Sequence, residues 1–458
     1  MTTAYQRIAV IDIGKTNAKV VVIDAATGQE LTAHRAPNRV LLDGPYPHFD
    51  TEGLWAFILH ALQQFVSAPG FDAISITTHG ASAALLDKNG ALALPVLDYE
   101  YAYPDHVRQD YCALRPEFVE TSSPLLSGGL NLGAQFHYQK TMFAVDFARV
   151  ATIVTYPQYW AFRLTGFAAN EVTSLGCHTD LWNPTSGHYS TLVEKLGVSA
   201  KMAELRSAFD ILGLLKPEIA SQIGTKGPIP VYCGIHDSNA SLLPHLVRRT
   251  APFAVVSTGT WIISFAVGSA ASALDPARDT LANVDAFGKP VPSSRYMGGR
   301  EFEILTQGLS EPPEDAVEAA AIDVIARDVM LLPNVVSGSG PFPNQMMRWI
   351  SKPENDVERY AAAGLYAAMM TANSLSLIAA AGPMIVEGPF ARNRLYLRTL
   401  ASVTGRDVVV GQGGTPTGTA EGAALLTGIS VSHMHDMIIP PGLIDVGPYY
   451  QRFVERLR

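Results

Sequence analysis

Cysteine is scarce in this sequence, and its scarcity limits the metal and redox chemistry that we expect. The 458 residues include three cysteines, Cys112, Cys177 and Cys233. They lie far apart and form no Cys-x-x-Cys pair, so the sequence predicts neither a structural zinc site nor a disulfide framework. No group of histidines has a metal-ligand spacing such as HExxH. Scattered thiols of this kind are typical of reduced cysteines in a cytoplasmic protein.

Dense clusters of positive charge are also missing. Asp and Glu together number 42 and Lys and Arg 33, which gives a formal net charge of -9 at pH 7. No run of Lys and Arg is dense enough for a nucleic-acid surface, so we expect no nucleic-acid partner. With 48% hydrophobic and 16% charged residues, the chain has ample material for a core and no signature of disorder. Its length predicts two domains.

A long apolar run that could cross a membrane is absent as well. The N-terminal residues MTTAYQRIAV lack the charged-then-apolar pattern of a signal peptide. Residues 360–386 carry no charge, but they are mostly alanine and are interrupted by Thr371, Asn373 and Ser374. This apolar character is too weak for a membrane span, and we expect a long buried helix there. The sequence therefore predicts a cytoplasmic protein with no membrane partner.

The most informative stretch is residues 8–24, IAVIDIGKTNAKVVVID. Two runs rich in Val and Ile predict two strands, joined by the polar turn Gly14-Lys15-Thr16-Asn17. A short glycine turn exposes backbone N–H groups, and such donors suit a phosphate. Asp12, just before the turn, is placed to hold Mg²⁺ or its water shell, because hard cations prefer oxygen ligands. A surface hairpin with a polar turn is the alternative that this stretch alone leaves open.

A Walker A loop is excluded, although Gly14-Lys15-Thr16 resembles the end of one. That motif requires a glycine five positions before its last glycine, and this position is Ala9, inside the first strand. No helix pattern follows the turn, because residues 19–23 continue as a strand.

A second hairpin of the same plan occurs at residues 253–267, FAVVSTGTWIISFAV. Aligning Gly259 with Gly14 places Ser257 opposite Asp12. Two such hairpins predict a duplicated fold whose copies face each other across a cleft and offer a turn each to one polyphosphate. We therefore predict domains at residues 1–245 and 246–458.

Helical and strand patterns alternate along the rest of the chain, which predicts an α/β fold. The expected helices are residues 51–65, with Asp50 or Thr51 as the cap, 356–380, 393–403 and 417–426. The expected further strands are residues 30–36, 72–77, 229–233, 384–388 and 407–410.

Four segments in this order resemble the motifs of the FGGY carbohydrate kinases, whose ribonuclease-H-like fold is shared with actin and hexokinase. Residues 12–19 resemble the first phosphate motif, and residues 234–237, GIHD, resemble the segment of the catalytic base. Residues 257–261, STGTW, resemble the second phosphate motif, and residues 385–401 the adenosine motif. The chain length is similar to the rhamnulokinase and fuculokinase branches. The resemblance implies two ribonuclease-H-like domains flanking a cleft, with the sugar site and the base in the first domain.

The resemblance also implies a role for individual residues. Asp237 is the expected catalytic base, although it could also cap a helix that starts at Ser238. Asp12 and Asp237 are the expected metal ligands. The expected ATP-binding residues are Gly14, Lys15, Thr16, Asn17, Thr258, Gly259, Thr260, Gly388 and Asn393. The expected substrate-binding residues are His79, Gly80, Asp98, His236 and Asp237.

The sequence departs from the family pattern at several positions. Gly388 is followed by Pro389, where a second glycine is usual. Asp98 precedes Tyr99 at the place where the family often has an aromatic residue, one residue and then Asp. Thr77 replaces the glutamine two residues before the substrate-site histidine. The sugar is therefore the least transferable feature, and a role for His178 in the sugar site stays open.

The predicted activity is an ATP- and Mg²⁺-dependent sugar kinase that phosphorylates a hydroxyl of a small sugar. A ketose of the rhamnulose, fuculose, xylulose or ribulose type is expected, and the resemblance implies that the chain can form a homodimer. One alternative is an ATP-driven binding protein of the actin or chaperone kind, which phosphorylates no small molecule. A regulatory relative without catalysis is disfavoured, because both Asp12 and Asp237 are present.

Overall fold

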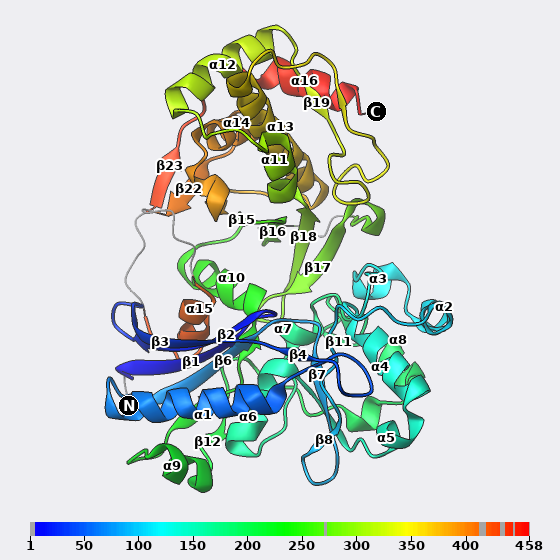
Figure 1. The fold of residues 1–458 in the computed structure, drawn as a ribbon, viewed down its shortest axis with the longest axis vertical. Coiled ribbons are helices and arrows are strands. Elements are labelled where there is room, and N and C mark those ends of the chain that lie inside the picture. The colour runs from blue at the N-terminus through cyan, green and yellow to red at the C-terminus, as the bar shows by residue number, and fades with distance from the viewer. Residues whose placement is uncertain (1–4, 270–272, 412–417, 431–435, 443–444, 458) are drawn as a thin grey trace. The chain divides into compact units, whose positions relative to one another are not determined.

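Two α/β units make up the part of the chain that the computed structural model describes, residues 5–269, 273–411, 418–430, 436–442 and 445–457 (Figure 1). Unit 1 comprises Met1–Arg248, Ala282–Pro290 and Thr417–His433, and unit 2 comprises Arg249–Leu281, Val291–Pro416 and Met434–Arg458. Each unit contains a sheet and its own helices, which confirms the predicted α/β class with two sheet-rich domains. The division into domains 1–245 and 246–458 stays a prediction.

The sheet of unit 1 has the strand order β12-β13-β6-β1-β2-β3, with β14 beside β6. The strands β1, β2 and β3 form the predicted antiparallel meander, and β6 runs parallel to β1. Their bounds are β1 Arg7–Ile13, β2 Asn17–Asp24, β3 Glu30–Pro37, β6 Ala73–Thr78, β12 Ile211–Leu214, β13 Pro230–Tyr232 and β14 Ile235–His236.

The alternation of side chains along β1 assigns each of its residues to one face of this sheet. Ala9 and Ile11 pack in a cluster with helix α1 (Thr51–Ser67) and helix α6 (Tyr156–Thr165). Ile8 and Val10 instead pack with Ala420 and its neighbours in helix α15 (Thr419–Leu425). Because the period of a strand is two residues, Asp12 belongs to the α15 face. Figure 1 shows α1 and α15 on opposite sides of the sheet.

The helices that flank the sheet of unit 1 follow their sequence signals. α1 begins where predicted, and its N-cap Asp50 accepts a hydrogen bond from the Gly53 N–H. Helix α10 (Asp237–Arg248) begins directly after β14 and packs on α15. The predicted start of α15 at Thr417 lies outside the described residues, and the described helix begins at Thr419.

Further elements of unit 1 form a helical region beside the sheet. The strands are β4 Val40–Leu41, β5 His48–Phe49, β7 Ala83–Leu86, β8 Leu92–Leu94, β9 Thr152–Thr155, β10 Trp182–Asn183 and β11 His188–Tyr189. The helices are α2 Asp105–Leu114, α3 Phe118–Thr121, α4 Leu132–Met142, α5 Ala144–Ala148, α7 Val172–Leu175, α8 Thr191–Lys195, η1 Ser199–Lys201 and α9 Pro217–Ile223.

The sheet of unit 2 repeats the plan of the first sheet. Its order is β17-β18-β16-β15-β21-β22-β23, and the chain passes from unit 2 into unit 1 along β17. β15 pairs antiparallel with β16 and parallel with β21, as β1 does with β2 and β6. This repetition agrees with the predicted duplication. The bounds are β15 Phe253–Thr258, β16 Ile262–Val267, β17 Thr280–Val284, β18 Pro290–Tyr296, β21 Met384–Glu387, β22 Val408–Gly411 and β23 Asp436–Ile439.

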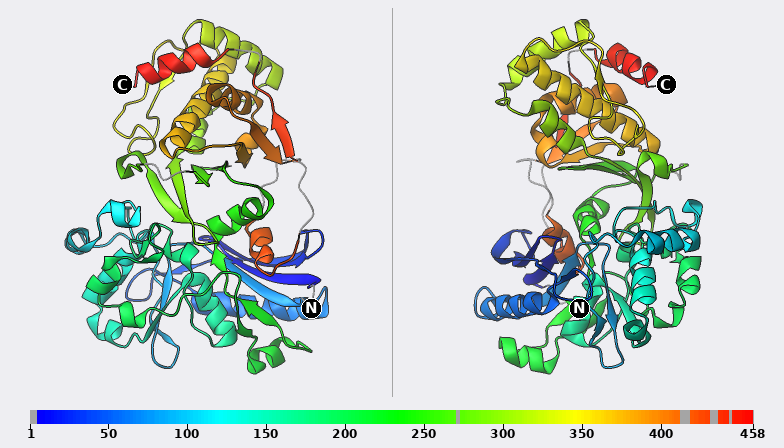
Figure 2. Two further views of the ribbon diagram at one scale, coloured as in Figure 1. Left: turned by 180° about the vertical axis from the view of Figure 1, so that it is seen from behind. Right: turned by 45° about the vertical axis from the view of Figure 1, so that its right-hand side comes forward.

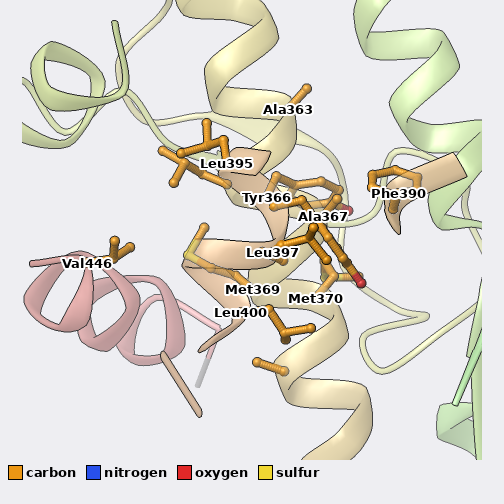
Figure 3. Packing of buried hydrophobic residues seen from close by; sticks show 14 of the residues in the cluster. Ala363, Tyr366, Ala367, Met369, Met370, Phe390, Leu395, Leu397, Leu400 and Val446 are labelled. Carbon is orange, nitrogen blue, oxygen red and sulfur yellow. The ribbon is translucent and has the colours of Figure 1, made fainter. Parts of the chain in front are cut away.

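The core of unit 2 is built around the alanine-rich helix α13 (Asp356–Leu377), shown in Figure 3. Alanines let neighbouring elements approach closely, and α13 contacts the helices α11, α12 and α14 and the strand β16. This buried helix was predicted, although it ends at Leu377 and not at residue 380. Among the described residues, the helices lack the length and apolar character needed to cross a membrane.

The remaining helices of unit 2 complete this half of the ribbon, which Figure 2 shows from two further sides. Their bounds are η2 Pro276–Arg278, α11 Gly298–Thr306, α12 Glu314–Ala326, η3 Pro389–Arg392, α14 Arg394–Thr404 and α16 Gly447–Glu455, and the short strands are β19 Leu331–Leu332 and β20 Arg348–Trp349. The N-cap of α14 is Asn393, whose side chain accepts a hydrogen bond from the Tyr396 N–H.

Candidate active site

Three neighbouring strands of unit 1 bring the main predicted residues together. β1, β6 and β14 run parallel, with Asp12 beside Thr77 and with Ile235 beside the same threonine. Parallel strands end at the same edge of a sheet, so the residues that follow them gather there. Asp12, His79 and Asp237 therefore lie at one edge, as the sequence predicts.

Asp237 is the first residue of α10, and its two carboxylate oxygens differ in their surroundings. Oδ1 accepts hydrogen bonds from the N–H and the hydroxyl of Ser238, at 2.6 and 3.3 Å, and lies 3.1 Å from His236 Nε2. Oδ2 has no partner among the described residues. Burial raises the pKa of Asp237 above its usual value, although its side chain keeps 29% of its exposure. Asp237 begins a helix and still keeps Oδ2 open, so its carboxylate can serve as a base.

His236 is a neutral ring beside Asp237, and its Nε2 also lies 3.8 Å from Cys177 Sγ. Burial lowers the pKa of His236 to about 4. Asn239 Nδ2 lies 3.3 Å from His236 Nδ1, and an amide nitrogen can only donate, so the ring proton is on Nε2. Gly80 leaves room for this ring, because a Cβ at Gly80 would lie 2.7 Å from His236 Nε2. Gly80 therefore leaves the space in which the His236 ring lies beside Asp237.

His79 offers an acceptor at the same edge. Its Nδ1 lies 2.9 Å from the carbonyl oxygen of Gly80, which only accepts, so Nδ1 carries the proton. Its Nε2 is buried and has no partner among the described residues. Burial lowers the pKa of His79 to about 4, so the ring is neutral at physiological pH. A ligand hydroxyl could satisfy Nε2 by donating to it.

Asp12 is held by a residue far away in the sequence. The hydroxyl of Thr419, at the start of α15, donates to Asp12 Oδ2 at 2.6 Å. Burial is the main cause that raises the pKa of Asp12, and the negative charge of Asp237 raises it further. Two carboxylates that repel each other, each with a raised pKa, form an oxygen donor set that a divalent cation would stabilise.

The carboxylates of Asp12 and Asp237 fit Mg²⁺, but they are too few for a metal whose ligands all come from the protein. The described residues contain no group of three or more His, Cys, Asp or Glu side chains that could hold a metal ion. Mg²⁺ usually keeps several waters and takes one or two carboxylates together with substrate phosphates. Asp12 and Asp237 meet that requirement.

Lys15 lies in the first turn, but its side chain points to the segment around Asp98. The Lys15 Nζ is 2.5 Å from Asp98 Oδ1 and 3.4 Å from a carboxylate oxygen of Glu100. It also lies 4.9 Å from the centre of the Phe49 ring and 5.2 Å from that of Tyr99. The structure thus brings the predicted ATP residue Lys15 to the predicted sugar residue Asp98.

The first turn is braced by its neighbours in unit 1. The Gly14 N–H donates to the Asn17 carbonyl at 2.9 Å, and Asn38 bonds both to the Gly14 carbonyl and to the Thr16 carbonyl. The N–H groups of Lys15 and Thr16 make no hydrogen bond within the described residues. Thr16 and Asn17 are exposed. The turn therefore has free donors of the kind that bind phosphate.

In the second turn, in unit 2, the Gly259 N–H donates to the Trp261 carbonyl at 2.9 Å. The Thr258 hydroxyl donates to the Glu387 carbonyl and accepts from the Phe390 N–H, so it is already engaged. Gly388 has φ +84°, and a Cβ there would lie 1.9 Å from the Thr258 carbonyl oxygen. Only glycine fits at this position. Gly259 and Thr260 are exposed beside it.

A cavity of about 480 Å³ within unit 2 adjoins this turn. Gly388 and Asn393, both predicted to bind ATP, line it together with Phe302, Tyr360 and Pro389. Its size is in the usual range for small-molecule sites, and its apolar rings suit a flat heterocycle.

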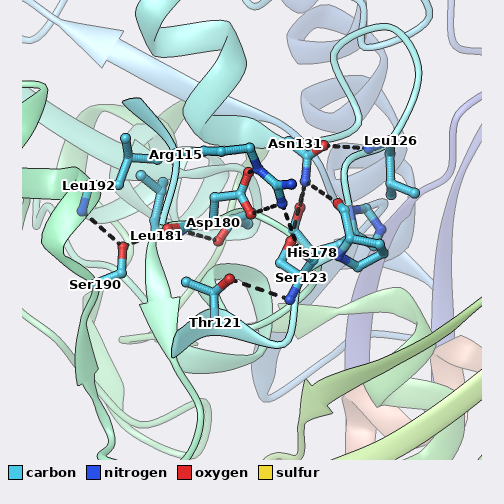
Figure 4. Close-up of polar contacts among 12 residues, drawn as sticks. Arg115, Thr121, Ser123, Leu126, Asn131, His178, Asp180, Leu181, Ser190 and Leu192 are labelled. Atoms are coloured by element: carbon cyan, nitrogen blue, oxygen red, sulfur yellow. Dashed lines mark hydrogen bonds and ion pairs between the residues drawn. The ribbon is translucent and has the colours of Figure 1, made fainter. Parts of the chain in front are cut away.

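His178 belongs to a loop held by a buried polar network, shown in Figure 4. His178 Nδ1 donates to the Leu130 carbonyl at 2.8 Å. The neighbouring Asp180 has a fully buried side chain, pairs with Arg115 at 2.9 Å and accepts from the Tyr111 hydroxyl. His178 and Asp180 both have positive φ, which costs energy outside glycine. The network therefore fixes the shape of this loop, and a sugar contact from His178 stays a prediction.

Sequence reasoning missed the residues that support the site. Thr419 lies 407 positions from Asp12, and Asn38 lies beyond the meander that it braces. Gly299 was also missed, although a Cβ there would lie 1.8 Å from the Gly259 carbonyl oxygen. The Gly298-Gly299 pair was the available signal for a close approach of two backbones.

Comparison with known families identifies the two halves of the chain. Residues 137–244 match the N-terminal domain of the FGGY family of carbohydrate kinases. Residues 250–435 match the description "Carbohydrate kinase FGGY, C-terminal domain". These ranges include Asp237 in the first match and both Thr258 and Gly388 in the second.

Similar individual proteins are also carbohydrate kinases. The chain is 24% identical to an L-fuculokinase of Haemophilus influenzae over 56% of this chain and 57% of that protein. It is 24% identical to a rhamnulokinase of Halalkalibacterium halodurans over 55% of this chain and 54% of that protein. These matches span about half the length of the curated relatives. The crystal structure of a carbohydrate kinase from Novosphingobium aromaticivorans is 36% identical, with a TM-score of 0.92 over 98% of this chain and 100% of that chain.

Proposed function

Because the chain belongs to the FGGY family of carbohydrate kinases, we propose that it transfers the γ-phosphate of ATP to a hydroxyl of a small sugar. The observation that carries this proposal is the geometry of Asp237. Its Oδ1 accepts hydrogen bonds from Ser238 and lies 3.1 Å from neutral His236, while Oδ2 has no partner among the described residues. A partly buried carboxylate with a raised pKa and one open oxygen suits a general base.

Asp237 accepts the proton of the sugar hydroxyl at Oδ2. As the O–H bond breaks, the sugar oxygen bonds to the γ-phosphorus, and the bond between that phosphorus and the bridging oxygen of ADP breaks. The hydrogen bonds from Ser238 hold the carboxylate in place, and the neutral His236 beside it does not compete for the proton. Because phosphoryl transfer needs mainly positioning and charge neutralisation, one well-placed base is sufficient.

The remaining residues hold the two substrates. In unit 1, the free N–H groups of Lys15 and Thr16 donate to phosphate oxygens. In unit 2, the exposed Thr260 offers a hydroxyl for phosphate, and Gly388 and Asn393 line the space for adenosine. Asp12 would hold Mg²⁺, and the nearby negative charge of Asp237 would favour the cation, which would neutralise phosphate charge. His79 and Asp98 accept hydrogen bonds from sugar hydroxyls.

We propose a ketose as the acceptor, of the rhamnulose, fuculose, xylulose or ribulose type. The fuculokinase and the rhamnulokinase among the relatives support this substrate class. Neutral His79 and His236 also suit an uncharged polyol, because neither ring carries a charge for an acidic group.

A coupled ADP-release screen over ketoses, aldoses and polyols tests the proposal. We expect sugar-dependent ADP release with the wild-type protein. Asp237→Asn should lower turnover by about 10²- to 10⁴-fold, because loss of a positioned base typically has this effect. ATP binding by the variant, measured by calorimetry, should persist. ADP release that is independent of any sugar, and unchanged in Asp237→Asn, would instead support the ATP-driven binding protein.

A further inference from the structure

We propose that Lys15, although it lies in a phosphate turn, is a positioning residue of the sugar site. In this assignment its ammonium group holds residues 98–100 in place and does not bind the phosphates of ATP. The inference rests on the proposed kinase function, because it assigns Lys15 to one of the two proposed substrates, the sugar, and not to ATP.

The ion pair of Lys15 is the first observation. Its Nζ is 2.5 Å from Asp98 Oδ1 and 3.4 Å from Glu100. The side chains of Lys15 and Asp98 are only 18% and 10% exposed. A charged hydrogen bond that is this shielded from water is much stronger than a surface pair. The ammonium group of Lys15 is therefore held by the Asp98 carboxylate.

Two aromatic rings hold the same ammonium group. The centres of the Phe49 and Tyr99 rings lie 4.9 and 5.2 Å from Lys15 Nζ, within the range of a cation–π contact. The same rings pack against the His79 ring, at 4.9 and 5.5 Å between centroids. Lys15 and His79 thus share their aromatic neighbours, which places Lys15 on the sugar side of the edge.

The pairing also prepares Asp98 as an acceptor. Asp98 Oδ1 accepts both from Lys15 Nζ and from the Glu100 N–H, at 2.5 and 3.2 Å. Within the described residues, Asp98 Oδ2 makes no hydrogen bond or ion pair. One oxygen is therefore fixed by the protein, and the other is left for a sugar hydroxyl.

Movement of Lys15 to a phosphate would leave a shielded carboxylate without its cation. Breaking such a pair is unfavourable, because the remaining charge is poorly solvated. The free N–H groups of the turn offer phosphate donors that need no such movement. Lys15 therefore connects the phosphate turn to the sugar segment through Asp98 and remains there when ATP binds.

Steady-state kinetics of Lys15→Met, Asp98→Asn and the double variant test this inference. Lys15→Met should raise the KM for the sugar about 10- to 100-fold, the range for losing a hydrogen bond to a charged group, and should leave the KM for ATP within about twofold. The double variant should be no worse than Asp98→Asn, because the two residues act as one unit. Lys15→Arg, which keeps the charge, should recover part of the sugar affinity.

Lys19→Met is the matched control, because Lys19 belongs to the same hairpin and pairs with Glu30, at 2.5 Å. It removes the same charge and should leave the KM for the sugar unchanged. A rise in the KM for ATP in Lys15→Met, with weaker calorimetric binding of a non-hydrolysable ATP analogue and an unchanged KM for the sugar, would overturn the inference and leave the kinase function standing. Failure of the wild-type protein to phosphorylate any sugar would overturn both.

Discussion

At the residue scale, each carboxylate of the site depends on hydrogen bonds from one neighbouring residue. Asp12 accepts a hydrogen bond from the Thr419 hydroxyl, and Asp237 accepts hydrogen bonds from the N–H and the hydroxyl of Ser238. Each of these bonds opposes the burial that raises the pKa of its carboxylate. The supporting residues therefore decide how readily the charged form is available to a cation or to a proton.

Thr419→Val should weaken Mg²⁺ binding. The variant keeps the shape of the side chain and removes the bond that lowers the pKa of Asp12, so this pKa should rise further. We expect the Mg²⁺ concentration for half-maximal activity to increase about 10-fold, and more at pH 6 than at pH 8. Thr427→Val is the control, because its hydroxyl donates to the Ala424 carbonyl of the same segment. Equal Mg²⁺ requirements in the two variants would contradict the role of Thr419.

Glu171 should make stability fall as the pH rises. Burial raises the pKa of Glu171 to about 7, so between pH 4.5 and 7 the folded chain holds a proton that the unfolded chain has released. The stability that this proton contributes is fully present below pH 4.5. About 3 kcal/mol of it is lost as the pH rises through about 7. Glu171→Gln should therefore gain melting temperature relative to wild type between pH 5 and 7.5.

The surface variant Glu218→Gln controls for general charge effects, since its side chain is 69% exposed. Parallel melting curves of wild type and Glu171→Gln across that pH range would refute the buried proton.

At the element scale, the close packing of α10 on α15 positions Thr419 beside Asp12. α15 is made of small residues, and a Cβ at Gly422 would lie 1.7 Å from the Ala240 carbonyl oxygen. The same helix places Thr419 on Asp12 and anchors Ser75, whose hydroxyl donates to the Ala423 carbonyl. The small side chains are therefore required for the distance between the two helices.

Gly422→Ala should force α15 away from α10. Overpacking of this kind costs about 1–3 kcal/mol, and the shift should also raise the Mg²⁺ requirement through Thr419. Chemical denaturation measures the first effect and activity titration the second. Gly227→Ala is the control, because a Cβ there meets nothing within 4 Å. A Gly422→Ala protein as stable as this control would show that the helices can separate freely.

At the scale of the whole molecule, neither unit is a continuous piece of chain. After the chain has entered unit 2, two later segments belong to unit 1 again, Ala282–Pro290 and Thr417–His433. Helix α15, which belongs to the second of these segments, packs on one face of the first sheet, where Ala420 and Ala423 contact Ile8 and Val10. The core of unit 1 is thus completed by residues near the end of the sequence.

A fragment of residues 1–248 should therefore fold poorly by itself. Without α15, the apolar face around Val10 and Val21 is exposed to water, which should lower the melting temperature and increase binding of a hydrophobic dye. Addition of a peptide of residues 417–433 should partly reverse both effects. A fragment that melts like the intact protein, and ignores the peptide, would show that α15 is dispensable for this core.

The sequence by itself determined the local elements and their order. Alternating Val and Ile residues predicted β1 and β2, Asp50 predicted the start of α1, and two glycine turns predicted a repeated plan. These features depend on neighbouring residues, whose side-chain period and hydrogen bonds are visible in a single stretch. The polar turn Gly14-Lys15-Thr16-Asn17 is also local in this sense.

Only the tertiary structure decided which residues support each carboxylate and where Lys15 points. Thr419 reaches Asp12 across 407 positions, and Lys15 reaches Asp98 across 83. Such pairs form because strand order and helix packing bring distant segments to one edge, and no periodicity in the sequence records that approach. Lys15 looked like a phosphate ligand from its turn alone, and its carboxylate and aromatic neighbours come from other segments.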